Sequence, residues 1–166
     1  MSARIDKEKP AVENTKSAKV MTPSDREIAI TRVFDAPRTI VFEAWTKAEH
    51  VVHWWDPSGA PLSVCEIDLR PNGAFRFVNS GLEGAKYPFA GIYSEIAPPE
   101  RLVFTTRNSS SGAATLIFSE HEGKTTLTMT IKCASRDERD ALLKMRVDVG
   151  TSRTLDNLDE YLKSIR

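Results

Sequence analysis

The stretch FDAPRTIVFEAWTKAEHVVHWW, residues 34–55, decides the fold class of this chain. An alternating apolar run, residues 27–34, leads into it and predicts a strand. Pro37 suits the first turn of a helix, and the apolar residues that follow recur at helical spacing up to Trp45. A second short helix ends at the pair Trp54-Trp55. The segment therefore predicts a strand followed by two short helices.

Six further strands are predicted after this segment. They are expected at Val64–Arg70, Ala74–Val78, Phe89–Ile96, Leu102–Arg107, Ala114–Ser119 and Thr125–Cys133. The connections are short and rich in Pro, Gly and Asn, which favours antiparallel neighbours. In the last strand apolar residues alternate with threonines, so one face is expected to be buried and the other wet. With the first strand, this makes seven.

The pattern changes to a helix from Arg136 onward. Its apolar residues follow a spacing of three or four and form one stripe: Leu142, Met145, Val149, Leu155, Leu158 and Leu162. Gly150 interrupts this stripe as a weak point of the helix. The order of elements predicts an α+β fold of the helix-grip type, in which a bent seven-stranded antiparallel sheet wraps around a long C-terminal helix.

Length and charge limit the classes of function. A chain of 166 residues fits one domain, expected at residues 25–166, after a disordered polar tail at residues 1–24. Lys and Arg together number 23, as do Asp and Glu, so no basic field is available for nucleic acid. No apolar run is long enough to span a membrane, and no signal peptide opens the chain, so a cytoplasmic location is expected. The near-zero net charge favours self-association, which makes a homodimer one alternative.

Four motifs in register carry a resemblance to a known family. They are FDAP at residues 34–37, the tryptophan pair at 54–55, DLRPNG at 68–73, and GIY at 91–93 with PPERL at 98–102. From Glu27 to Arg166 the chain resembles homologues of the activator of the heat-shock-protein-90 ATPase, within the START-like (SRPBCC, Bet v-type) superfamily. The resemblance implies a cavity between sheet and helix. Members of the superfamily bind lipids, hormones, polyketides or aromatic molecules, and some are cyclases or dehydratases. Thr151 stands where many relatives have an aromatic residue.

Large side chains on successive strands and on the last helix are the candidate lining of such a cavity. Adjacent helical residues point about 100° apart, so at most one residue of the tryptophan pair faces the cavity directly. The Tyr93 hydroxyl is the candidate polar anchor for a ligand. The expected ligand-binding residues are Trp54, Phe77, Phe89, Tyr93, Phe104, Met129, Met145 and Val149.

Charged residues on the strands have two interpretations. Glu66 and Asp68 share one face of a strand and could act as an acid–base pair if an apolar cavity raised one pKa. The favoured alternative is a solvated face on which they meet Arg70 and Arg76. Arg32 could reach a ligand carboxylate, but pairing with a surface acid is preferred.

The sequence indicates neither a metal site nor a cofactor. His50 and His53 lie three residues apart, but no third ligand is arranged beside them, and GxSxG, GxGxxG and Walker motifs are absent. The leading hypothesis is therefore non-enzymatic binding of a small hydrophobic or aromatic molecule. One alternative is a cyclase-, dehydratase- or hydrolase-like enzyme that would use His53, Glu66, Asp68 or Tyr93. The other is a module that interacts with a chaperone or another protein.

Overall fold

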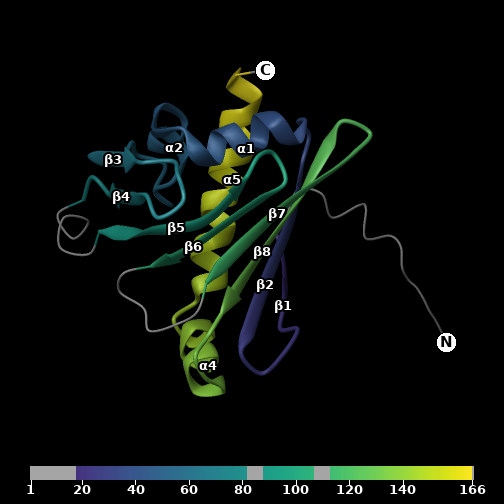
Figure 1. The fold of residues 1–166 in the computed structure, drawn as a ribbon, viewed down its shortest axis with the longest axis vertical. Helices are drawn as coiled ribbons and strands as arrows, with labels where there is room; N and C mark the ends of the chain where they lie inside the picture. Colours follow the sequence, from purple (N-terminus) through teal and green to yellow (C-terminus); the bar gives the residue numbers. More distant parts are fainter. Residues whose placement is uncertain (1–17, 82–87, 107–112, 166) are drawn as a thin grey trace.

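The computed structural model describes residues 18–81, 88–106 and 113–165, which form one sheet with helices packed against it (Figure 1). In chain order the elements are β1 (Lys19–Met21), β2 (Glu27–Phe34), α1 (Arg38–Thr46), α2 (Ala48–Trp54), β3 (Val64–Ile67), β4 (Ala74–Val78), β5 (Phe89–Ala97), β6 (Arg101–Thr106), β7 (Ala114–His121), β8 (Lys124–Lys132), α4 (Arg136–Lys144) and α5 (Val147–Ile165).

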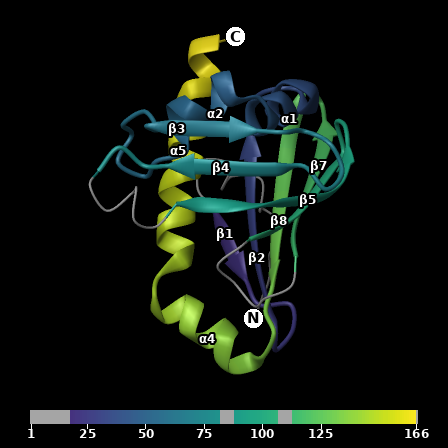
Figure 2. The same cartoon turned by 60° about the vertical axis from the view of Figure 1, so that its left-hand side comes forward.

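The sheet is antiparallel throughout and has the strand order β1-β2-β8-β7-β6-β5-β4-β3. The sheet is strongly bent. Figure 2 shows this, since β3 and β4 run across the direction of β2 and β8. The register of β5 against β6 shifts between Tyr93 and Glu95, and such an irregularity helps a strand to bend. The predicted α+β helix-grip architecture is confirmed.

Helix α5 packs along the concave side of the sheet, with α1 and α2 near its C-terminal half and α4 at its N-terminal end (Figures 1 and 2). Its residues Leu155, Leu158 and Leu162 are buried in the core, as the apolar stripe predicted. Arg32 of β2 also ties the sheet to α5. Its guanidinium is buried and lies 2.6 Å from a carboxylate oxygen of Asp156.

The sheet has eight strands rather than the seven predicted. The additional strand is β1, which pairs with β2 through Lys19 opposite Thr31 and Met21 opposite Ala29. It belongs to the segment expected to be a tail, of which residues 1–17 lie outside the described residues. All three of its residues are exposed, so backbone pairing with β2 fixes this strand and no apolar alternation marks it.

The single C-terminal helix expected from Arg136 onward is two helices. The chain turns between them at Arg146, whose φ of 62° is left-handed and therefore ends α4. Arg146 N donates to Leu143 O, while Arg146 O accepts from Val149 N and Gly150 N. One residue thus closes α4 and opens α5. Gly150, the expected weak point, lies within α5.

Candidate functional site

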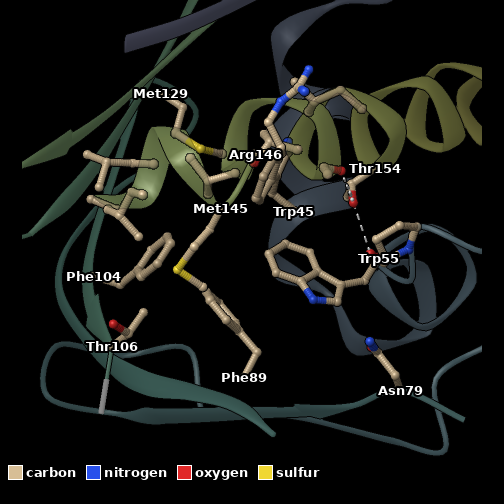
Figure 3. A pocket seen from close by; sticks show the side chains of 18 residues that line it. Trp45, Trp55, Asn79, Phe89, Phe104, Thr106, Met129, Met145, Arg146 and Thr154 are labelled. Carbon is tan, nitrogen blue, oxygen red and sulfur yellow. Dashed lines mark hydrogen bonds between the residues drawn. The ribbon is translucent and has the colours of Figure 1, made fainter. Parts of the chain in front are cut away.

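A cavity of about 610 Å³ lies between the concave face of the sheet and the junction of α4 with α5 (Figure 3). Its volume falls within the range of roughly 300–1,000 Å³ that is usual for small-molecule sites. The lining residues come from α1, from the loops that follow α2 and β4, from β5 to β8, and from both C-terminal helices with the turn between them. They include Trp45, Trp55, Phe89, Phe104, Met129 and Leu155.

Aromatic rings form one continuous wall of the cavity. The Trp55 ring lies 5.0 Å from the Phe89 ring and 5.9 Å from the Trp45 ring, measured between centroids. Phe89 in turn lies 6.2 Å from Phe104 in an edge-to-face arrangement. The oxygen Trp55 O accepts a hydrogen bond from Thr154 Oγ1 at 3.2 Å, so α5 holds this part of the wall in place. Such a wall suits flat or aliphatic groups.

The cavity opens to solvent where α4 meets α5. Met145 and Arg146 both line the cavity, yet Met145 is 76% exposed and Arg146 is also exposed. In Figure 3 the Met145 side chain points toward Phe89 and Phe104. Residues that are both cavity-lining and exposed mark an opening, and Pro57 in the loop after α2 is a further such residue. At the opening between α4 and α5, which is called the mouth from here on, an apolar and a cationic residue are neighbours in sequence.

Few polar groups line the cavity. Asn79, Thr106 and Thr151 add amide and hydroxyl groups, and Arg146 is the only charged lining residue among those that the structure describes. The Trp45 Nε1–H is buried in the wall and has no hydrogen-bond partner among the described residues. A ligand would therefore meet an apolar interior and a small number of polar groups, most of them at the edges.

The tryptophans are placed differently from the sequence expectation. Trp54 is fully buried, and its Nε1 donates to Ala44 O at 3.1 Å, which turns the ring into the core and away from the cavity. Trp55 lines the cavity in its place, together with Trp45 of α1. The sequence expectation missed Trp45. The apolar helical spacing that ends at this residue could have indicated it, because that spacing places the ring on the inner face of α1.

The other expected lining residues divide into two groups. Phe89, Phe104, Met129 and Met145 line the main cavity. Phe77 and Tyr93 instead border a neighbouring void of about 10 Å³, and Val149 borders neither space. The α5 residues that face the cavity are Val147, Gly150, Thr151, Thr154 and Leu155.

Gly91 of β5 allows close packing of the aromatic rings that surround Phe75, which lies outside the main cavity. A Cβ at this position would lie 2.1 Å from the backbone oxygen Thr105 O of β6 and 2.7 Å from the Phe75 ring, so only glycine fits between that backbone and that ring. Phe75 then lies 5.1 Å from Tyr93 and 5.2 Å from Phe104 between ring centroids. These rings fill the space beneath β4 and β5 and leave there only the void of about 10 Å³.

The four candidate catalytic residues do not converge on the cavity. His53 is exposed and its ring stacks on Tyr161 at 5.6 Å. Glu66 is exposed opposite Arg76 in the register of β3 with β4, as the favoured interpretation predicted.

Asp68 and Tyr93 likewise lie outside the main cavity. Asp68 is exposed and forms an ion pair with Arg70 at 2.9 Å. Tyr93 is buried, and burial together with the nearby Cys65 raises the pKa of its hydroxyl far above the usual range. This hydroxyl stays protonated at neutral pH.

Metal-ligating residues do not cluster in the part of the chain that the structure describes. Within it, no group of three His, Cys, Asp or Glu side chains is arranged to hold a metal ion. His50 Nδ1 lies 2.5 Å from the Tyr161 hydroxyl, so this histidine is engaged between α2 and α5. None of the helices in the same described ranges is long and apolar enough to cross a membrane.

Residues 35–163 match the family described as "Activator of Hsp90 ATPase homolog 1-like protein". The chain belongs to this family. The resemblance predicted from the four sequence motifs is thereby confirmed. The match spans both short helices, most of the sheet and nearly all of α5, and therefore every element that lines the cavity.

Solved structures of bacterial proteins share the family fold. A protein of Rhodobacter sphaeroides has a TM-score of 0.82 at 23% identity, covering 90% of this chain and 99% of that chain. A protein of Nitrosomonas europaea has a TM-score of 0.77 at 25% identity, covering 86% and 97%. An AHSA1-like protein of Aeromonas hydrophila has a TM-score of 0.70 at 20% identity, covering 84% and 93%. No curated protein matches the chain.

Proposed function

We propose that the protein binds a small, predominantly apolar molecule in the cavity between sheet and α5, without transforming it. The observation that carries this proposal is the cavity of about 610 Å³ with its aromatic wall of Trp55, Phe89 and Phe104. An unfilled apolar space of this size forfeits packing contacts unless a ligand supplies them. The superfamily resemblance, whose members bind lipids and aromatic molecules, supports the same ligand class.

The enzymatic alternative lacks a mechanism in this geometry. General acid–base chemistry needs a titratable group within hydrogen-bond reach of the substrate. His53, Glu66, Asp68 and Tyr93 all lie outside the main cavity, whose described lining includes no His, Asp, Glu, Cys, Tyr or Lys side chain. A binding role requires none of these groups.

The chaperone-interacting alternative remains a separate prediction. It draws on the family description and on the polar segment 1–24, of which only residues 18–24 are described. A pull-down with and without residues 1–24, combined with an assay of chaperone ATPase rate, tests it. A tail-dependent partner or a changed rate would support this role, and neither effect would be expected if ligand binding is the sole activity.

Native mass spectrometry against a panel of fatty acids, fatty alcohols and aromatic metabolites tests the binding proposal. The expected result is a saturable one-to-one complex with at least one apolar member, and weak binding of polar compounds of the same size. Quenching of tryptophan fluorescence should follow the same saturation curve, because Trp45 and Trp55 line the cavity. If no member of the panel binds at concentrations up to its solubility, the proposal is wrong.

A further inference from the structure

We infer that the ligand is an amphiphile with an anionic head group, which Arg146 holds at the mouth of the cavity while the apolar part lies inside. This inference rests on the proposed function, because it names the chemistry of the molecule that fills the same space. It assigns a role to Arg146, the one charged side chain among the described residues of the cavity wall, which the binding of a purely apolar molecule leaves unused.

The Arg146 guanidinium is available to a ligand. It is exposed and has no ion pair or hydrogen bond to another side chain of the described residues. Arg32, Arg70 and Arg101, by contrast, each lie within 3.1 Å of a carboxylate oxygen. Figure 3 shows the nitrogen atoms of Arg146 at the edge of the group of lining side chains, on the side away from Phe89 and Phe104. An anionic group there would gain a charged partner in Arg146, and no ion pair within the protein would have to break first.

The backbone fixes where this side chain starts. Arg146 has a φ of 62°, a conformation that is uncommon for residues other than glycine and asparagine. Its N–H and C=O groups are both engaged, with Leu143 O on one side and with Val149 N and Gly150 N on the other. Because both helices hold it, the residue stays at the mouth. The charged neighbours on the same segment are Lys144, which ends α4, and Asp148 in the first turn of α5.

The interior behind Arg146 accepts only the apolar part of such a molecule. An isolated carboxylate among Trp55, Phe89 and Phe104 would lose its hydration without gaining a partner, so the head group must stay at the mouth. A water-sized group occupies roughly 30 Å³, so a chain of about ten carbons needs on the order of 300 Å³. The cavity of about 610 Å³ holds such a chain with space left for a second branch or a ring.

Four ligands with one ten-carbon chain separate the head-group chemistries: decanoate, decyl phosphate, decanol and decyltrimethylammonium. We expect the wild-type protein to bind decanoate or decyl phosphate at least tenfold more tightly than decanol, and the ammonium compound most weakly. The tighter of the two anions assigns carboxylate or phosphate as the natural head group. The preference for the anions over decanol should shrink as KCl is raised from 20 to 500 mM, because the Arg146 side chain is exposed to solvent.

Variants at two arginines assign the preference to one residue. Arg146→Gln should bring the anions and decanol to within about twofold of each other, while decanol itself binds as in the wild type. Arg146→Lys should keep part of the preference, because a positive charge remains. Arg153→Gln is the matched control, since Arg153 is exposed on α5, the helix that follows Arg146, but does not line the cavity, and it should keep the full preference.

The outcomes separate this inference from the proposed function. If decanol binds as tightly as the anions, or if the preference survives Arg146→Gln, the head-group assignment is wrong and the apolar cavity still stands. If none of the four compounds binds the wild-type protein, the head-group assignment is wrong, and the wider panel with its aromatic metabolites then decides whether the proposed function is wrong as well. Thermal denaturation of each variant shows that any loss of preference occurs in a folded protein.

Discussion

Gly150 offers the sharpest test of where the cavity lies. It is inside α5 and lines the cavity, and apart from its chain neighbours and the backbone of α5 itself no atom of the described residues lies within 4 Å of the place where a Cβ would stand. A glycine in a helix interior costs up to about 1 kcal/mol relative to alanine. Gly150→Ala should therefore raise the free energy of unfolding by about 0.5–1 kcal/mol. For a chain of this size each kcal/mol corresponds to roughly 2–4 °C in Tm.

Gly150→Trp uses the same open space to exclude a ligand. A tryptophan is the largest side chain and buries about 150–250 Å² of its surface, so at this position it would project into the space between α5 and the aromatic wall. We expect this variant to fold with a Tm at or above that of the wild type, and its affinity for decanol to fall by about 100-fold or more. Arg153→Trp, on the exposed side of α5, should leave the affinity unchanged.

Thermal denaturation followed by circular dichroism gives the stabilities, and titration with decanol gives the affinities. A Gly150→Ala protein less stable than the wild type would show that the space beside Gly150 is filled. A folded Gly150→Trp protein that binds decanol as well as the wild type would place the site away from α5.

Three further predictions concern the core and its charges. Leu158→Ala should lower the free energy of unfolding by about 2–5 kcal/mol, because this side chain is fully buried; a protein as stable as the wild type in urea would show that α5 packs differently. Arg32→Met should change the free energy of unfolding by less than about 1 kcal/mol, since Asp156 remains solvated without its partner. The double variant Asp156→Ala and Asp159→Ala should lower it by about 3–5 kcal/mol, because the Arg32 guanidinium is then buried and has no ion pair. Urea denaturation of both proteins checks this order, and the reverse order would contradict it. Stability should also fall as pH rises from about 9 to 11, because the unfolded Cys65 thiol has a pKa of 9.0 while burial raises the pKa of the folded thiol to about 11. In Cys65→Ala this part of the alkaline loss should vanish, and an unchanged pH profile would exclude the thiol as its cause.

The strands that bury one face could be predicted from sequence, because alternation and turn residues carry that information. Residues 27–34 and 74–78 have the bounds of β2 and β4 as predicted. Strand β1 could not be found in this way, since three exposed residues show no alternation. Its place in the sheet depends on backbone pairing with β2, to which the side chains contribute no pattern.

The break between α4 and α5 also left no signal in the sequence. The residues around Met145 and Arg146 include neither proline nor glycine, and the apolar stripe continues across them. An arginine in the left-handed region ends α4, and the α5 residues Leu155, Leu158 and Leu162 then pack in the core. As a result Met145 reaches solvent at the cavity mouth instead of the core.

The composition of the site was easier to predict than its orientation. The sequence indicates that aromatic residues surround an interior. It does not fix the rotation of the second short helix about its axis, and a rotation of about 100° turns Trp55 instead of Trp54 toward the cavity. The hydrogen bond from Trp54 Nε1 to Ala44 O sets that rotation, and it joins two different helices. Phe77 and Tyr93 lie on the expected concave face but are packed too closely against other rings to reach the main cavity.

The methionine methyl groups provide the most direct test of ligand binding between sheet and helix. Met129 and Met145 line the cavity, whereas Met21 is exposed on the edge strand β1 and serves as an internal reference. In a protein labelled with ¹³C at the methionine methyls, titration with decanol should shift the resonances of Met129 and Met145 along one saturation curve and leave Met21 unchanged. Binding that shifts Met21 alone, or that leaves both cavity methyls unmoved, would contradict the account.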